Sequence, residues 1–552
     1  MRSDVKDPEI AYRRRWLTLA VLCMSLMVIG LDNTILNVAL PTLSHAKNLG
    51  GLGASGSALQ WIVDAYTLVF AGLLLTMGSL GDRFGRYKFL TFGLVVFGTG
   101  SVLSAFAPSA GVLIATRSLM GIGGACIMPG TLSILSNVFR SPGERARAIG
   151  VWAGVSALGV GIGPVAGGAL LTHFWWGSVF LVNVPIVVTA LVLGYFFVPD
   201  SYDKTTPRLD PVGAALSIVS LGALLWAIIE APSHGWTSSE ILTGFGVGAV
   251  LLVGFFVWEL KSSSPMLDLH FFQNPRFSAA SAAIMLVFLA LFGTIFLLTQ
   301  YLQSVLGYST LKAGAILIPQ SAALMTFAFL SPRWVVRFGN KAVVAFGLTM
   351  VAISLVSFVT LDVGSSALHV ILVSVLMGIG MGNVMAPATE SIMGSLPREK
   401  AGVGSAMNDT TRQVGGAVGV AVLGSVLSSH YGPALASRLS GKVPASLVTA
   451  ARDSVGRAVG VVNDPAHPVA ANIRAEVVNA AHQSFIGGLH LASLIAAGIV
   501  LIAVVGVLVW LPARAVDERA DDTVPLPQPE PELVESGAVV AVNSLAVALE
   551  HD

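Results

Sequence analysis

Hydrophobic residues along this chain fall into long runs separated by short polar segments. A bilayer core of about 30 Å needs roughly 20 apolar residues per helix. Fourteen runs meet this length, at 16–40, 57–77, 89–107, 111–138, 146–171, 178–198, 210–230, 241–260, 277–300, 313–334, 341–360, 367–390, 402–430 and 484–511. The first is too long for a signal-peptide core of roughly 7–15 residues. The pattern predicts an all-α membrane protein with 14 transmembrane helices.

Composition agrees with a membrane environment. Of 552 residues, 54% are hydrophobic and only 11% are charged, too few to cover a soluble globule of this size. The two cysteines, Cys23 and Cys126, lie inside apolar runs, so we expect neither a disulfide nor a metal site. A net charge of +1 gives no basis for binding nucleic acid. We expect no cofactor and no metal.

The basic residues predict the orientation of the helices, because cytoplasmic loops hold the excess of lysine and arginine. Short loops after even-numbered spans carry Arg83, Arg86, Lys88, Arg140, Arg145, Arg147, Arg333, Arg337 and Lys341. Short loops on the other side hold little beyond Lys47 and Lys312. Both termini are therefore expected in the cytoplasm.

Two segments depart from the pattern of spans and short loops. A loop at 431–483 precedes the last span, and apolar residues at helical spacing within 446–462 predict an amphipathic helix on the outer face. A tail at 512–552 combines prolines with acidic residues and reads as disordered.

Three ionisable residues lie at membrane depth in the first four spans. Each costs about 2.5–3.5 kcal/mol on insertion scales, so a functional role is the default interpretation. Asp32, Asp64 and Arg117 come from three helices and reach a similar depth in the outer half. Burial favours the neutral form of a carboxyl group and a nearby arginine favours the charged form, so the group could form a proton site. The alternative is a permanent structural pair of Arg117 with one aspartate.

Charges in the later spans are less informative. Asp409 and Arg412 are spaced i, i+3 and share one face of a helix. A coupling role and a self-neutralised structural pair are equally open for them. Glu230, Glu259 and Glu390 lie near span ends, where a side chain can reach headgroup water. We expect these three to be structural.

The loop after the second span joins two helices in a tight turn that holds one acid and three bases. Its functional candidates form an expected gating loop, in which a carboxylate among bases could act as a breakable latch: Gly78, Asp82, Arg83, Gly85 and Arg86. A plain positive-inside loop with turn glycines is the alternative. The spacing resembles the signature cytoplasmic loop of the major facilitator superfamily.

The resemblance extends along nearly the whole chain. Arg117 and the glycines after it look like the superfamily's helix 4 motif, which implies a role in proton transfer, although Met120 stands where many members have glutamine. The fifth span resembles the motif that marks antiporters, with residues Gly159, Gly163, Pro164, Gly167 and Gly168. Glycines permit close helix packing and a proline breaks one backbone hydrogen bond, so the segment can bend and seal.

Within the superfamily, the first two spans are similar to the 14-helix drug:proton antiporter branch of quaternary ammonium and multidrug exporters. This resemblance implies a bundle of six helices at 16–198, two inserted helices with a linker at 199–276 and a second bundle at 277–511, after a cytoplasmic segment at 1–15. It implies proton-coupled export of lipophilic cations such as quaternary ammonium compounds, dyes and antibiotics by a monomer in contact with membrane lipid.

Three aromatic residues, Trp61, Tyr66 and Phe296, could line an apolar cavity and stack on flat cations, although single aromatic residues are more often packing groups. The tenth span carries no carboxylate, which leaves Asp409 and Glu390 as the acids of the second bundle. A lipid or glycolipid exporter of the same fold is the alternative function. The chain shows no metal-spaced histidines, no nucleophile and base in one loop and no phosphate-binding glycine loop, which argues against an enzyme.

Overall fold

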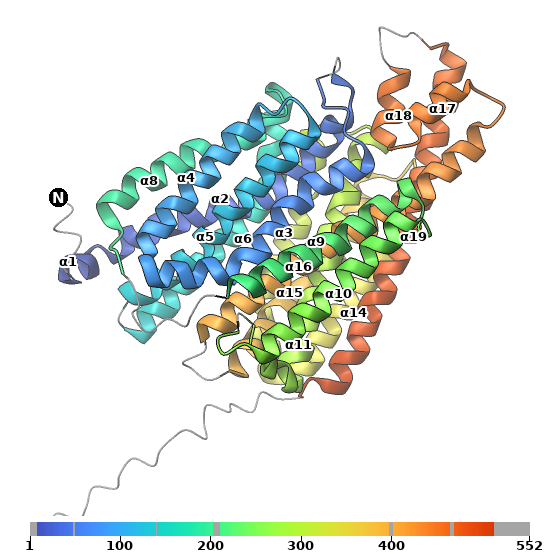
Figure 1. The fold of residues 1–552 in the computed structure, drawn as a ribbon. Helices are drawn as coiled ribbons and strands as arrows, with labels where there is room; N and C mark the ends of the chain where they lie inside the picture. Colours follow the sequence, from blue (N-terminus) through green and yellow to red (C-terminus); the bar gives the residue numbers. More distant parts are fainter. Residues whose placement is uncertain are drawn as a thin grey trace, which may run out of the picture. The chain divides into compact units, whose positions relative to one another are not determined.

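The computed structural model describes residues 8–47, 50–139, 141–201, 210–265, 267–396, 401–463 and 469–512, and it is helical in nearly all of them (Figure 1). Arg140 and the tail at 513–552 lie outside the described residues. The helices are α1 (Pro8–Arg13), α2 (Arg15–Ser44), α3 (Gly56–Phe84), α4 (Arg86–Ala105), α5 (Ala110–Val138), α6 (Pro142–His173), α7 (Ser178–Leu181), α8 (Asn183–Phe197), α9 (Pro211–His234), α10 (Ser239–Lys261), η3 (Leu269–Gln273), α11 (Pro275–Gln300), η4 (Tyr301–Val305), α12 (Thr310–Ile316), α13 (Ile318–Phe338), α14 (Asn340–Ser357), η5 (Phe358–Thr360), α15 (Ala367–Gly394), α16 (Ala401–Leu439), α17 (Ala445–Ala451), α18 (Val455–Val462) and α19 (Ala471–Trp510).

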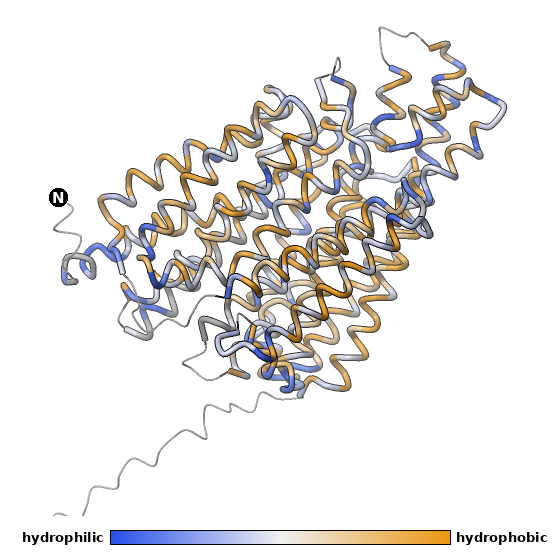
Figure 2. Tube along the Cα trace, viewed as in Figure 1, coloured by the Kyte–Doolittle hydropathy of each residue, from blue (hydrophilic) through white to orange (hydrophobic). Residues whose placement is uncertain are grey.

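The long helices have the length and composition of membrane spans. Thirteen helical segments of the described residues are long and apolar enough to cross a bilayer. The 32-residue helix α6 packs among them as the fourteenth. Figure 2 shows hydrophobic residues along the helices and hydrophilic residues near their ends. Large apolar side chains such as Val250 and Ile502 remain 71% and 72% exposed, which suits a surface that faces lipid.

Several boundaries differ from those predicted. The last span begins at Ala471, well before 484, and α16 continues to Leu439. The single amphipathic helix expected at 446–462 was wrong, because the chain forms α17 and α18 with a break between them. Ser454 produces the break, since its Oγ accepts a hydrogen bond from Arg457 N at 3.2 Å and caps a new helix.

Two groups of helices pack around their own cores. In the first, α2 packs on α6, and α3 and α4 pack on α5; in the second, α11 packs on α16, and α13 and α14 pack on α15. The hairpin of α9 and α10 lies beside them, with α9 against both α3 and α16. We call these groups the first bundle (α2–α8) and the second bundle (α11–α16 with α19).

The two ends of the bundles differ. We call the end that carries α17 and α18 the cap end, and the opposite end, where Gly85 joins α3 to α4, the loop end (Figure 1). Ser55 starts α3 at the cap end by accepting from Ala58 N, and Gly85 stops it with a φ of +118°, a conformation that favours glycine. The helices α17 and α18 pack on each other, and α18 also contacts α2 and α19.

Candidate functional site

A buried ion pair joins α2 to α5 in the first bundle. Arg117 Nη1 lies 2.5 Å from Asp32 Oδ2, and the two side chains are 2% and 0% exposed. Arg117 Nε also donates to the carbonyl of Ile62 at 3.1 Å, and the guanidinium lies 4.4 Å from the centre of the Tyr66 ring. Each member of a pair buried to this degree needs the other, because removing one partner would leave an unpaired charge inside the protein.

Polar side chains complete the surroundings of this pair. Asn183 Nδ2 donates to Asp32 Oδ1 at 3.5 Å and to Ser101 Oγ at 3.4 Å. The thioether of Met120 accepts from Ser104 Oγ at 3.5 Å and lies 3.8 Å from Arg117 Nη1. Ser101 and Ser104 were not among the predicted site residues. The only sequence signal for them is that they are small polar residues in an otherwise apolar span.

Asp64 does not join this pair. Its side chain is fully buried, and neither carboxylate oxygen has a hydrogen-bond partner among the described residues. Gln60 and Leu68, one turn to either side of it, both pack on α16: an added Cβ at Gly424 would lie 2.6 Å from Gln60 Cδ, and Leu68 packs with Ala421. Asp64 therefore occupies the face of α3 that meets the second bundle, whereas Ile62 and Tyr66 face Arg117.

The pair predicted in the second bundle is looser. Arg412 Nη1 lies 3.8 Å from Asp409 Oδ1, and the side chains are 25% and 11% exposed. Arg412 Nη2 donates to Thr389 Oγ1 at 3.1 Å, and its guanidinium lies 5.5 Å from the Phe288 ring centre. Glu390 is exposed. Glu259 was expected to reach headgroup water, but its side chain is only 3% exposed. It accepts a hydrogen bond from Leu267 N at 2.9 Å, which fits the expected structural role.

The gating-loop residues form a helix junction at the loop end. Asp82 Oδ1 accepts from Arg86 Nε at 2.6 Å, whereas Arg83 is exposed. A Cβ at Gly85 would lie 3.0 Å from Asp200 Oδ1, and one at Gly78 would lie 3.3 Å from Pro129 Cβ of α5. The contacts described for this loop all lie within the first bundle or with the segment that follows α8.

Glycines of α6 let it pack closely on two sides. Toward α2, a Cβ at Gly159 would lie 3.0 Å from Met27 O, and one at Gly163 or Gly167 would lie within 3.0 Å of Ile35 atoms. These three glycines therefore fix the approach of two helices within the first bundle.

Other residues of the same motif face the second bundle at the cap end. Thr310 Oγ1 of α12 donates to Gly168 O at 3.1 Å. A Cβ at Gly314 would lie 2.2 Å from Pro164 O. Farther along, Gln303 Nε2 of η4 donates to Val38 O of α2 at 2.9 Å. These contacts close the two bundles against each other at the cap end.

The three aromatic residues do not line one cavity. Tyr66 is 1% exposed and packs on Arg117, whereas Trp61 packs with Leu225 and other apolar residues of α9 and α16. Phe296 is 2% exposed and lines a separate pocket at the cap end.

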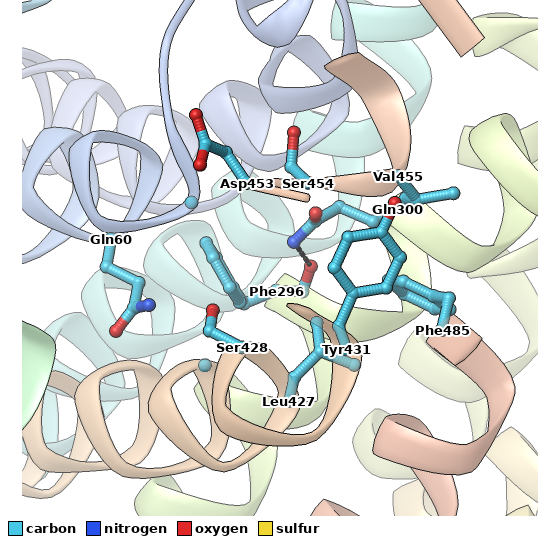
Figure 3. A pocket seen from close by; sticks show the side chains of 12 residues that line it. Gln60, Phe296, Gln300, Leu427, Ser428, Tyr431, Asp453, Ser454, Val455 and Phe485 are labelled. Atoms are coloured by element: carbon cyan, nitrogen blue, oxygen red, sulfur yellow. Dashed lines mark hydrogen bonds between the residues drawn. The ribbon is translucent and has the colours of Figure 1, made fainter. Parts of the chain in front are cut away.

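That pocket lies between the bundles and below the turn from α17 to α18. Its empty volume is about 310 Å³, part of which is open solvent. Figure 3 shows polar side chains around this space from four parts of the chain, namely Gln60, Gln300, Ser428, Tyr431 and Asp453. No local sequence pattern predicts this pocket, because its residues are spread from position 56 to position 485.

The sequence matches a known protein family. The profile of the Major Facilitator Superfamily matches residues 22–420. In the described residues no group of three or more His, Cys, Asp or Glu side chains could hold a metal ion.

Curated relatives are similar over nearly their whole length. The multidrug efflux pump LfrA of Mycolicibacterium smegmatis is 36% identical over 90% of this chain and 96% of its own. The tetracenomycin C resistance and export protein of Streptomyces glaucescens is 32% identical over 93% of this chain and 95% of its own. The methyl viologen resistance protein SmvA of Salmonella typhimurium is 34% identical over 82% of this chain and 90% of its own.

Solved structures share the fold. A bacterial homologue of the human lysosomal transporter Spinster, in an inward-facing and unoccupied conformation, aligns with a TM-score of 0.60 at 16% identity over 90% of this chain and 98% of its own. The peptide transporter POT in complex with sulfate aligns with a TM-score of 0.57 at 15% identity over 89% of this chain and 94% of its own.

Proposed function

The chain belongs to the major facilitator superfamily, and from this premise we propose that it is a proton-coupled antiporter that exports lipophilic cations. It is a multi-pass membrane protein and a multidrug efflux transporter, not an enzyme. The expected substrates are quaternary ammonium compounds, cationic dyes and antibiotics. The relative named for resistance to methyl viologen, a dication, supports this class.

The observation that carries the proposal is the orphan carboxyl group of Asp64. Burying an ionised carboxylate without a partner is far too costly to persist, so this closed conformation suits neutral Asp64. A cation bound beside Asp64 would supply the missing partner and stabilise the charged form. Asp64 can therefore hold either a proton or a cationic substrate, which is the exchange that an antiporter needs.

The Asp32–Arg117 pair has a different role in this proposal. It is already neutralised, and its hydrogen bonds to Ile62 and Asn183 tie four helices together, namely α2, α3, α5 and α8. We assign it the task of holding these helices together, which fixes the position of α3 and therefore of Asp64. We assign Asp409 and Arg412 a supporting structural role in the second bundle. Their side chains lie 3.8 Å apart, so each charge has a partner of opposite sign within the same helix.

We also propose that the cap end faces outward and that both termini are cytoplasmic. The loop end carries Arg83, Arg86 and Lys88, and basic residues concentrate in cytoplasmic loops. In a bacterial cell the protein would then lie in the inner membrane as a monomer, with its cap end closed in the state described. Rocking of the two bundles would expose Asp64 first to the cytoplasm and then to the outside.

The test is ethidium efflux from energised cells at matched expression. We expect the wild type to extrude the dye, a protonophore to stop it, and Asp64→Asn to abolish it. Asp362→Asn is the matched control, because this carboxylate is exposed at the cap end. Equal efflux by wild type and Asp64→Asn would refute the role of Asp64. A lack of dye movement in the wild type would favour lipid or glycolipid export by the same fold.

A further inference from the structure

The pocket at the cap end is better suited to water than to a drug. Ligand pockets for drug-sized molecules occupy about 300–1,000 Å³, whereas the space here that a water-sized sphere can occupy is about 20 Å³. A single water molecule needs about 10–15 Å³ of such space and two or more polar partners. Gln60 of α3, Gln300 of α11 and Asp453 of the turn between α17 and α18 supply such partners (Figure 3).

Asp64 lies directly below this pocket along α3. It follows Gln60, which lines the pocket, by four residues, or about 6 Å along the axis. Side chains of a helix lean toward its N-terminus, and α3 begins at the pocket with Gly56. The Cα–Cβ bond of Asp64 therefore tilts toward the end of α3 at which Gln60 and the pocket lie.

Gln60 separates the two. Its side chain is 1% exposed and is pressed against the α16 backbone at Gly424. Its Oε1 accepts from Ser425 Oγ at 3.4 Å, a long hydrogen bond, while the same hydroxyl donates to Ile228 O at 2.6 Å. A weakly held amide is a barrier that can rotate to pass a proton.

Few charges lie around the route. From α2 and α5 the Asp32–Arg117 pair is self-neutralised, and from α9 Glu230 accepts from Ser233. On α16, Asp409 and Arg412 lie 12 or more residues toward the loop end. Asp453 at the pocket is paired with Arg457. Asp64 is thus the acceptor nearest to the pocket along α3.

We propose that the pocket is a water-filled entry site from which protons reach Asp64 past Gln60 while the bundles are closed at the cap end. With a cation bound beside Asp64 the carboxyl group is charged. When the Gln60 amide rotates aside, a hydronium ion from the pocket transfers its proton to a carboxylate oxygen of Asp64, which leaves a water molecule, a neutral carboxyl group and a cation without a partner. The protein can then take up its coupling proton without exposing the substrate path. This inference rests on the proposed function of Asp64.

The test uses purified full-length protein in liposomes with a trapped pH indicator and the cap end facing a buffered exterior. Ser428→Leu fills the pocket, and Gln60→Leu removes the amide. We expect both to slow ethidium-coupled proton flux about tenfold, equal to roughly 1.4 kcal/mol in the barrier. The loss should shrink as the cap-side pH falls, and ethidium affinity should be unchanged. Ser429→Leu is the matched control, because it adds the same side chain to the next residue of α16, which does not line the pocket, and it should keep wild-type flux.

A third variant works in the opposite direction. Gln60→Ala shortens the barrier, and we expect a proton leak that needs no substrate. Ethidium binding and a monodisperse chromatographic peak establish that each variant is folded. Coupled flux in wild type with unchanged flux in Ser428→Leu and Gln60→Leu, or no leak in Gln60→Ala, would overturn the entry site while leaving the antiport intact. Uncoupled wild type would instead refute the proposed function itself.

Discussion

A substitution at the contact between α6 and α12 should lower the population of the conformation in which the two bundles are closed at the cap end. At Gly314 a new Cβ would lie 2.2 Å from Pro164 O and 2.7 Å from Pro164 C. Ordinary van der Waals contact requires about 3.5 Å, so Gly314→Val forces the two bundles apart by about 1 Å or more at the cap end. Overpacking of this kind costs about 1–3 kcal/mol. Since a tenfold change in a population corresponds to about 1.4 kcal/mol, the closed population should fall roughly 5- to 150-fold relative to the open one.

The measurement is a distance distribution between spin labels at the cap ends of the two bundles. Val112→Cys in α5 and Leu368→Cys in α15 are 41% and 63% exposed positions, introduced after Cys23 and Cys126 are replaced by alanine. We expect Gly314→Val to add a population at longer distance. Gly161→Ala is the control on the same face of α6, because its Cβ would meet Ser321 Cβ at an ordinary 3.6 Å. A wild-type distribution in Gly314→Val would contradict this reasoning.

Two further predictions concern stability. Arg117→Met should destabilise the protein by about 3–5 kcal/mol because it leaves Asp32 buried without a partner. Adding Asp32→Asn should recover part of this loss of stability. A double variant whose loss equals the sum of the two single losses would contradict a direct pair. Burial lowers the pKa of His45, which follows α2 at the cap end. The neutral form is therefore favoured in the fold, so full stability is expected above the unfolded pKa of about 6.5 and is lost as the pH falls through the folded value. Thermal denaturation between pH 8 and pH 5, compared with His45→Gln, should show this acid sensitivity in wild type alone.

The sequence predicted the spans well because each one needs a long apolar run, and that requirement is local. The meeting of Asp32 and Arg117 also followed from depth, since two charges at one level of neighbouring helices gain by pairing. Asp64 shares that level, yet it faces α16 while Tyr66 faces α5. Depth is visible in the sequence, but the neighbour that each face of α3 meets is set by packing between distant helices.

Packing between distant segments also explains why the sequence did not predict the pocket or the break between α17 and α18. Gln60 and Asp453 are almost 400 positions apart and meet only when the bundles close. The break between α17 and α18 depends on Ser454, whose capping role competes with a continuous apolar stripe that favoured one helix. Local patterns therefore identified which residues were unusual, whereas tertiary contacts decided which of them act together.

The length of α16 and α19 has a practical consequence for imaging. At 1.5 Å per residue these helices of 39 and 40 residues extend about 60 Å, roughly twice the thickness of a bilayer core. Most of a transporter of this size is hidden in a detergent micelle and gives little to align in electron micrographs. The helical extension with α17 and α18 projects at the cap end (Figure 1), and an antibody fragment raised against it would give each particle an orientation marker.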